Sequence, residues 1–319
     1  MQRRYLTAAL AVLALSASAA SVFPQDGQIS APTPQAAPAA EPQFPPVDPA
    51  NFTSTTPTKD QVDSFLKATW GYDTERVWQV AAIQKTAAAG ISKVQVWVAE
   101  KPSPQLGNFS FFVTADGKHI IAQDQVLDFG TRPFDNAWHT LQQRADGPSR
   151  GATGKQFMLV EFADFECPHC KEAEPIVDKL LQDFPQAHYV FQSFPLVNIH
   201  AEAFTAAAFG QCVFQQGGKD AFFKYAESTF DAQTALAGQG ADQALRNSVT
   251  AAGLDPDKVT TCAGTAEAKS AVHSSMQLGI DLNVDQTPML FVDGRGLPML
   301  AVPYEQLKKI IEWQFANDK

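Results

Sequence analysis

The sequence has few charged residues, no surplus of basic residues, and only four cysteines. Of its 319 residues, 18% are charged, and 34 acidic against 24 basic residues give a formal net charge of -10. Such an acidic chain is not expected to bind nucleic acid or anionic lipid surfaces. After the N-terminus, no apolar stretch reaches the roughly 20 residues that a transmembrane helix needs. Hydrophobic residues still make up 45% of the chain, enough for a globular core.

The first 20 residues have the pattern of an export signal. Arg3 and Arg4 precede an apolar run over 6–15, and small residues follow at 17–19, as in a cleaved secretory signal. The apolar run is too short for a stable anchor, and an ordinary N-terminal helix is the alternative. We therefore predict a signal peptide over 1–20 and a periplasmic or other extracytoplasmic location, where disulfides persist.

Two regions follow before the cysteines begin. Residues 21–57 are rich in Pro, Ala, Gln and Thr, a composition that predicts a disordered linker. Thr58 can cap a helix with apolar residues at helical spacing, and 94–98 alternate as in a strand. Asp116-Gly117 is a hairpin signal between two further short strands. Residues 58–145 therefore predict a small α+β domain.

A second linker is expected over 145–151, and a mixed pattern follows it. Apolar strands are expected over 157–162, 189–194 and 289–292, with a long helical stretch over about 200–282 and a closing helix over 304–315. Strand–helix–strand, helical insertion, strand–strand–helix predicts a layered α/β domain over 150–319.

The motif Cys167-Pro168-His169-Cys170 follows the first of these strands and opens a helix. Unpaired N–H groups and the helix dipole favour negative charge there, so we expect Cys167 to be a reactive thiolate. Pro168 suits an early helical position, and His169 can add positive charge or a donor to the same sulfur. Cys170, one turn later, is then the resolving thiol that closes or releases a mixed disulfide.

Three other interpretations of the motif are possible. A structural disulfide between residues three apart is possible but unusual. A metal site needs about four ligands, and no second cluster of suitable spacing lies nearby in the sequence. Two coincidentally buried cysteines do not account for the position at a strand–helix junction. The pattern favours thiol–disulfide exchange, with no cofactor and no metal.

The run from Leu159 to Cys170 resembles the active-site segment of the DsbA-like disulfide oxidoreductases. The resemblance covers about 150–319 and implies a thioredoxin fold with a helical insertion. It implies that Glu161 is a buried carboxyl with a raised pKa that shuttles the proton of the buried thiol. A solvent-facing carboxylate is the alternative for Glu161.

The same resemblance implies roles for three further residues, and the sequence departs from the family pattern at two places. Thr287-Pro288 matches a loop with a cis-proline that lies against the reactive cysteine and pairs with substrate backbone. His200 matches a histidine at the start of the family's insertion, although on its own it reads as a surface or helix-start residue. Glu166 is a departure whose charge should oppose thiolate formation. Some members also place a cation near the second strand, where this chain has Gln192 and Ser193.

Cys212 and Cys262 lie 50 positions apart in the helical stretch. We predict a structural disulfide that closes this loop and contributes about 4 kcal/mol on the chain-entropy model. Two free buried thiols or a redox-switch pair are the alternatives.

The run from Phe111 to Ile121 resembles the N-terminal dimerisation domain of the DsbC/DsbG disulfide isomerases. It implies a homodimer through 58–145 that holds unfolded substrate proteins. The favoured function is an exported oxidase that forms disulfides in reduced secreted proteins and is reoxidised by a DsbB-like membrane partner. A dimeric isomerase or reductase, acting on misfolded proteins and kept reduced by a DsbD-like partner, is the alternative. A thioredoxin-fold binding or chaperone module without exchange activity is the second alternative.

Overall fold

The computed structural model describes residues 42–122 and 125–317. Its internal contacts divide the chain into two units, one ending at Pro133 and the other beginning at Phe134. The predicted signal peptide and residues 21–41 of the predicted linker lie outside the described residues. The second unit thus begins earlier than residue 150, where the sequence pattern set it.

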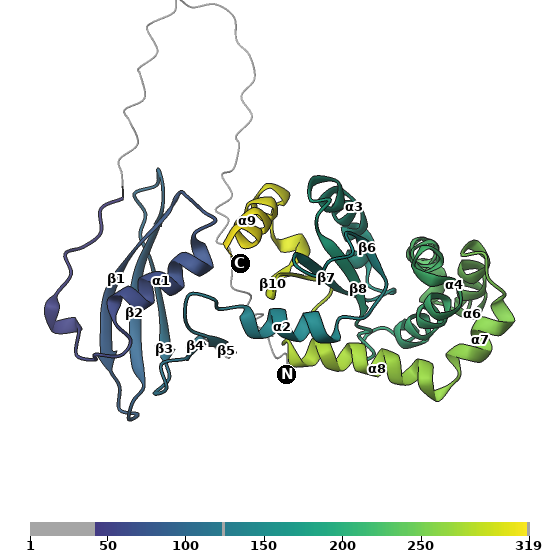
Figure 1. Ribbon diagram of the computed structural model, residues 1–319, viewed down its shortest axis with the longest axis horizontal. Helices are drawn as coiled ribbons and strands as arrows, with labels where there is room; N and C mark the ends of the chain where they lie inside the picture. The colour runs from purple at the N-terminus through teal and green to yellow at the C-terminus, as the bar shows by residue number, and fades with distance from the viewer. Residues whose placement is uncertain (1–41, 123–124, 318–319) are drawn as a thin grey trace, which may run out of the picture. The chain divides into compact units, whose positions relative to one another are not determined.

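The first unit is a helix on an antiparallel sheet (Figure 1). Its strands follow one another in sheet order: β1 (Arg76–Lys85), β2 (Ser92–Glu100), β3 (Gly107–Val113), β4 (His119–Ala122) and β5 (Gln125–Asp128). Helix α1 (Lys59–Trp70) begins at the predicted cap Thr58, whose side chain accepts from the N–H of Gln61. Val62, Phe65 and Leu66 of α1 pack on the sheet, and the predicted small α+β domain is present.

Two features of this unit differ from the sequence expectation. Strand β1 was not predicted, because a bulge between Val80 and Ala82 interrupts its alternation of buried residues. The described end of the predicted linker is not an extended tether. A short 3-10 helix, η1 (Pro49–Asn51), leads to Phe52, which bridges Ile83 of β1.

The second unit has a five-stranded mixed sheet in the order β10-β9-β7-β8-β6. Its strands are β6 (Ser149–Gly151), β7 (Met158–Ala163), β8 (His188–Ser193), β9 (Met289–Val292) and β10 (Arg295–Pro298). The central pair β7 and β8 is parallel, and β9 runs antiparallel to β7. Edge strand β6 lies within the segment expected to be a second linker, because Ser149–Gly151 pair with β8.

Helices cover both faces of this sheet (Figure 1). Helices α3 (Pro168–Asp183) and α9 (Tyr304–Asn317) lie on one face, joined where Tyr304 donates to Asp183 at 2.9 Å. Helices α2 (Asp135–Arg144) and α8 (Ala266–Asp281) lie on the other. Leu141 of α2 and Leu278 of α8 share a core with Val160 and Phe162 of β7. Because this core holds α2, the helix belongs to the second unit rather than to the predicted 58–145 domain.

The expected helical insertion separates β8 from β9. It consists of α4 (Ala203–Asp231), α5 (Gln233–Leu236), α6 (Ala241–Ala251), α7 (Pro256–Ala263) and α8. Helix α4 has a kink at Gly218, whose φ of 73° is in the left-handed region that glycine tolerates. The fold is the predicted one, a thioredoxin fold with a helical insertion. A second 3-10 helix, η2 (Met299–Ala301), follows β10.

Candidate active site

Cys167 lies at the junction between the central strand and the helix that follows it. β7 ends at Ala163, a short loop follows, and Cys167 is the N-cap of α3 with Pro168 in the first turn. The residue is 5% exposed, and its thiol donates to the carbonyl of Thr287 at 3.5 Å. The sulfur therefore occupies the helix N-terminus that the sequence pattern indicated.

This position favours the thiolate of Cys167. The thiol of Cys170 donates to it, and this bond lowers the pKa of Cys167 to about 5 against the opposing effect of burial. Thr287 and then the backbone N–H groups of Cys170 and His169 add to the lowering. Hydrogen bonds to a charged sulfur stabilise it most where water is excluded. At neutral pH Cys167 is thus a thiolate in the reduced protein.

Cys170 is the opposite kind of thiol. It is fully buried, and its sulfur accepts from the backbone N–H of Asp164 at 3.4 Å. Burial first, and then the neighbouring Cys167 thiolate, raise the pKa of Cys170 well above its usual range. Both thiols are free in this structure. The pair therefore combines one thiolate and one protonated thiol, the arrangement that a nucleophile and a resolving cysteine need.

Glu161 of β7 lies on the same sheet face as α3 and is completely buried. Its Oε2 accepts from the hydroxyl of Tyr189 at 2.5 Å, and its Oε1 has no partner among the described residues. Burial raises the pKa of Glu161 to about 8, and its charge in turn acts on Cys170. The solvent-facing alternative for Glu161 is thereby excluded.

A cation does lie near this buried acid, on edge strand β6. Arg150 of β6 stacks on the ring of Phe223, with its Cζ 4.3 Å from the centroid, and lies 5.3 Å from that of Tyr189. Its Nη2 is 3.8 Å from Glu174 of α3. Burial raises the pKa of Glu174 to about 7, while Arg150 opposes the rise. One connected network of buried and partly buried polar side chains therefore joins Glu161, Tyr189, Arg150 and Glu174.

Thr287 and Pro288 lie against the nucleophile. The Thr287–Pro288 bond is cis, and the loop leads directly into β9. The Thr287 carbonyl accepts from the neutral Cys167 thiol. The Thr287 side chain is buried and contributes to the lowered pKa of Cys167.

The His169 side chain does not contact the sulfur as the sequence suggested. The ring is exposed, and its Nδ1 lies 3.0 Å from Glu172, whose carboxylate raises the pKa of His169. Residues three apart on a helix are neighbours, which accounts for this pair. The backbone N–H of His169 lowers the pKa of Cys167, and the Cys167 charge helps to raise the pKa of the His169 ring, so the predicted electrostatic contribution is present without a direct contact.

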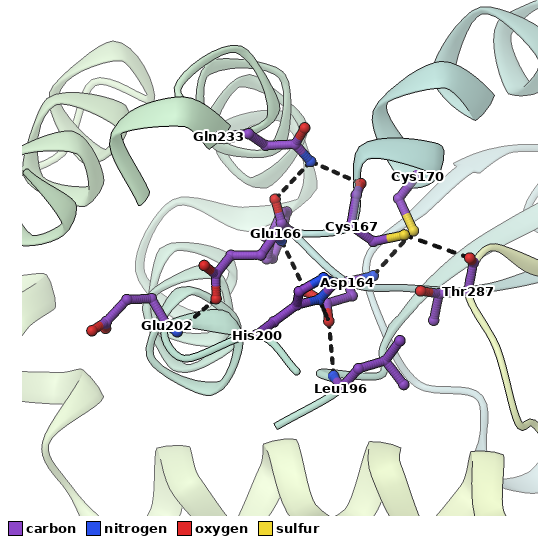
Figure 2. A network of polar contacts seen from close by, with 10 residues as sticks. Asp164, Glu166, Cys167, Cys170, Leu196, His200, Glu202, Gln233 and Thr287 are labelled. Atoms are coloured by element: carbon purple, nitrogen blue, oxygen red, sulfur yellow. Dashed lines mark hydrogen bonds and ion pairs between the residues drawn. The ribbon is translucent and has the colours of Figure 1, made fainter. Parts of the chain in front are cut away.

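Asp164 and His200 form a second buried cluster beside the cysteines (Figure 2). One carboxylate oxygen of Asp164 accepts from the N–H of Leu196 and lies 2.8 Å from Nδ1 of His200. The other oxygen accepts from the N–H of Glu166 at 2.8 Å. Asp164 was not singled out in the sequence, because a buried carboxylate that binds backbone has no local signature. Its own N–H is the donor to Cys170, so the cluster fixes the buried sulfur.

The Glu166 carboxylate binds the start of the helical insertion. Its Oε2 accepts from the N–H of Glu202 at 2.6 Å, at the N-terminus of α4 (Figure 2). Partial positive charge at a helix N-terminus compensates a carboxylate placed there.

The other two cysteines are joined to each other. Cys212 of α4 and Cys262 of α7 form a disulfide across 50 residues. The bond ties the short helix α7 to α4, the longest helix of the insertion. It shares no residue with the site around Cys167.

The described residues contain neither a metal-binding cluster nor a membrane-spanning helix. Over 42–122 and 125–317, no three His, Cys, Asp or Glu side chains lie close enough to bind a metal ion together. No helix in that part of the chain is long and apolar enough to cross a bilayer.

A family model described as thioredoxin matches residues 144–313, more than half of the chain. The chain belongs to the thioredoxin family. The matched residues include both site cysteines, the buried Glu161, the cis-proline loop and the whole insertion. The first unit lies outside the match.

Curated relatives of this thioredoxin-family chain are of two kinds. The chain is 34% identical over 148 residues to the Na(+)/H(+) antiporter NhaA 1 of Salinispora arenicola, which covers 46% of the chain and 21% of the antiporter. It is 24% identical over 168 residues to disulfide bond formation protein D of Bacillus subtilis, covering 52% of the chain and 75% of that protein. The chain thus spans about a fifth of the antiporter's length.

Solved structures with similar thioredoxin folds include two bacterial proteins. The catalytic domain of ScsC from Proteus mirabilis is 20% identical with a TM-score of 0.48, covering 57% of this chain and 99% of that one. BdbD from Bacillus subtilis is 22% identical with a TM-score of 0.48, covering 53% of this chain and 93% of that one.

Proposed function

We propose that this chain is an exported thiol–disulfide oxidoreductase that forms disulfides in reduced extracytoplasmic proteins. The observation that carries the proposal is the asymmetry of the Cys167–Cys170 pair. One sulfur has a pKa lowered to about 5 at a helix N-terminus, and the other is buried with a raised pKa. A structural disulfide or an inert thiol pair needs no such difference in pKa between its two sulfurs.

The exchange begins from the oxidised pair. A substrate thiolate attacks Cys167 Sγ, a new S–S bond forms, and the Cys167–Cys170 bond breaks. The electron pair goes to Cys170, which takes up a proton because its thiolate is strongly disfavoured by burial. Glu161, protonated at neutral pH and close enough to act on Cys170, is the proton donor on this account.

The second step releases the product. Another substrate thiolate attacks the substrate sulfur of the mixed disulfide, and Cys167 leaves as a thiolate. A thiol with a low pKa is a good leaving group, so the stabilisation of Cys167 favours this direction. Two electrons pass from the substrate dithiol to the pair. Thr287 and Pro288 lie against the sulfur, where they would pair with substrate backbone.

The proton on Glu161 must be replaced after each cycle. Tyr189 bonds Glu161, and Arg150 stacks near Tyr189 and approaches Glu174, whose side chain is 26% exposed. With a pKa of about 7, Glu174 can exchange protons with solvent at neutral pH. The cation of this network is Arg150 of β6. The positions on β8 where some family members carry a cation hold the uncharged residues Gln192 and Ser193.

The preferred direction is oxidation. An oxidised pair is a strong oxidant when its reduced form is stabilised, and a thiolate stabilised by several hydrogen bonds provides that. The reduced protein must then return its electrons to a DsbB-like membrane partner. An extracytoplasmic location and an export signal over residues 1–20 belong to the same proposal, as does action without cofactor or metal.

A dimeric isomerase is the second candidate, and the outer face of the first unit favours it. Phe112, Ile121 and Val126 stand opposite one another across β3, β4 and β5, on the face away from α1. Phe112 is 40% and Val126 61% exposed. Apolar side chains in such a row are suited to bind another protein surface. A homodimer through residues 58–145, kept reduced by a DsbD-like partner, would use this face.

The reduction potential separates the two candidates. We expect the Cys167–Cys170 pair, equilibrated with glutathione buffers, to have a potential well above the roughly −270 mV of thioredoxin and above −200 mV. The full chain should also oxidise a reduced test protein at substoichiometric concentration in the presence of an oxidant. A potential near that of thioredoxin would overturn the oxidase proposal. If the full chain neither oxidises nor reduces the test protein, the binding-module alternative would be favoured.

The oligomeric state tests the isomerase candidate by itself. Sedimentation of the full chain should give a dimer that Val126→Asp dissociates. A monomeric wild-type chain at micromolar concentration would remove the dimer and with it the reason to prefer isomerisation.

A further inference from the structure

The segment at the end of α4 and the start of α5 contacts the catalytic loop at several points. The ring of Phe230 packs 5.3 Å from that of Phe165, centroid to centroid. Asp231 forms an ion pair with Lys171 of α3 at 2.9 Å. The helical insertion therefore reaches both sides of Cys167 in the sequence, the loop before it and the helix after it.

Gln233 makes the most direct of these contacts. Its Nε2 donates to the carbonyl of Phe165 at 3.0 Å and to the carbonyl of Cys167 at 2.8 Å. A primary amide nitrogen carries two hydrogens, so each carbonyl can receive its own. Figure 2 shows Gln233 above the loop, with both bonds converging on its amide nitrogen.

The Cys167 carbonyl is already part of the helix that supports the thiolate. It accepts from the N–H of Cys170 at 3.1 Å and so begins the hydrogen bonding of α3. The orientation of this carbonyl fixes the peptide plane between Cys167 and Pro168. The position of the sulfur relative to the N–H groups of His169 and Cys170 follows from that plane.

We propose that Gln233 is a positioning residue for the nucleophile, because it anchors the backbone of Phe165 and Cys167 to the helical insertion. It does not touch the sulfur or a substrate. It holds the loop in the one arrangement in which the sulfur meets the N-terminus of α3. A helical insertion of this kind thereby tunes the reactivity of the cysteine as well as covering the sheet.

The proposal takes Cys167 as the nucleophile from the proposed function, and the two can fail separately. The pKa of Cys167, read from thiolate ultraviolet absorbance, reports the anchoring even if the protein oxidises no substrate. Conversely, an active enzyme with an unchanged thiolate in Gln233 variants retains the proposed function and loses this inference.

The test compares two Gln→Met substitutions in the insertion of the full chain. Gln233→Met keeps the length of the side chain and removes both donors. Gln243→Met is the matched control, because exposed Gln243 of α6 donates only to Asn247 at 2.8 Å. We expect Gln233→Met to raise the pKa of Cys167 by about half a unit to one unit, the effect of one or two lost hydrogen bonds.

The alkylation rate of Cys167 shows whether Gln233 positions the nucleophile or only stabilises the fold. Alkylation of Cys167 near the midpoint of its titration should slow by about 2- to 5-fold in Gln233→Met, as the thiolate fraction falls. The control should leave both the titration and the alkylation rate unchanged. Gln233→Ala should reproduce the Gln233→Met result.

Three results would contradict the proposal. The first is an unchanged Cys167 titration in both Gln233 variants. The second is an equal shift in the Gln243 control. The third is loss of the fold in Gln233→Met and Gln233→Ala alike, because the amide would then serve folding rather than the thiolate.

Discussion

The two pairs of cysteines in this chain lie in one unit and have opposite chemistry. Cys167 and Cys170 are separated by one helical turn at the start of α3, and both are free thiols. Cys212 and Cys262 come from different helices and are bonded to each other. The first pair is surrounded by groups that distinguish one sulfur from the other. The second pair lies between helices of the insertion.

The difference shows that the backbone groups around a cysteine decide whether it is a reactive thiolate or part of a structural disulfide. Cys167 receives hydrogen bonds at a helix N-terminus, whereas Cys170 faces buried Glu161 and the N–H of Asp164. Cys212 is buried in the middle of α4, where the backbone N–H groups are used within the helix. A reactive pair needs unpaired donors, and a structural pair needs only the right separation.

The largest expected effect is the loss of activity on replacing the nucleophile. Cys167→Ser should abolish both oxidation of a reduced test protein and reduction of insulin, because a serine hydroxyl is not ionised at neutral pH. The matched control is the double variant Cys212→Ser with Cys262→Ser, which should retain the wild-type rate at a temperature where it is folded. Activity retained in Cys167→Ser would remove the assignment of the nucleophile.

The same double variant should show where the second pair acts. Removing a disulfide that closes a loop of 50 residues should lower the free energy of unfolding by about 2–5 kcal/mol. Urea denaturation of the oxidised proteins measures it. A loss of activity without a loss of stability would instead indicate that Cys212 and Cys262 are a redox pair.

A smaller effect is expected at the buried acid. Glu161→Gln removes the proton donor to Cys170 but keeps the size of the side chain. We expect the exchange to slow by about 10- to 100-fold, the lower part of the range for general acid–base catalysis. Stopped-flow measurement of the mixed-disulfide step should show it. The control, Glu172→Gln, changes an exposed carboxylate of α3 that pairs with His169.

Glu161→Gln should also change how the free energy of unfolding depends on pH. The pKa of Glu161 is raised from 4.5 to about 8, so the unfolded chain loses this proton first. The folded state is therefore penalised increasingly as pH rises from about 4.5 to about 8. Glu161→Gln should remove that decline in the reduced protein. A parallel stability curve in wild type and variant would show that Glu161 is not a raised-pKa acid.

The smallest effect is expected at the residue just before the nucleophile. Because the Glu166 carboxylate binds the N-terminus of α4, Glu166→Gln should leave the pKa of Cys167 within about 0.3 units of wild type. Titration of the thiolate absorbance measures it. A fall of a full unit would mean that the Glu166 charge opposes the thiolate after all.

Much of the fold could be predicted because its signals are local. Thr58 and the apolar spacing after it predicted α1, and Asp116-Gly117 predicted the β3–β4 hairpin. A strand followed directly by a cysteine motif and a helix predicted the reactive junction at Cys167. The resemblance added the cis Thr287–Pro288 bond, which neither periodicity nor spacing reveals.

What could not be predicted depends on contacts between distant segments. The bulge in β1 hid its alternation, and only packing against Val160 and Phe162 assigns α2 to the second unit. Arg150 and Gln233 have no local pattern, since each reaches residues far away in the sequence. The partners of the His169 ring and of the Glu166 carboxylate, Glu172 and the N–H of Glu202, could not be predicted either, because adjacency to a cysteine in sequence does not fix where a side chain points.

The central claim is that Cys167 is a thiolate beside a protonated Cys170. The most direct measurement is the pH dependence of iodoacetamide alkylation at Cys167 in the reduced full chain, located by mass spectrometry. A rate that rises through a single midpoint near pH 5 and modifies Cys170 slowly is predicted. A midpoint near the usual thiol value of about 8.5, or equal modification of both sulfurs, would contradict the account.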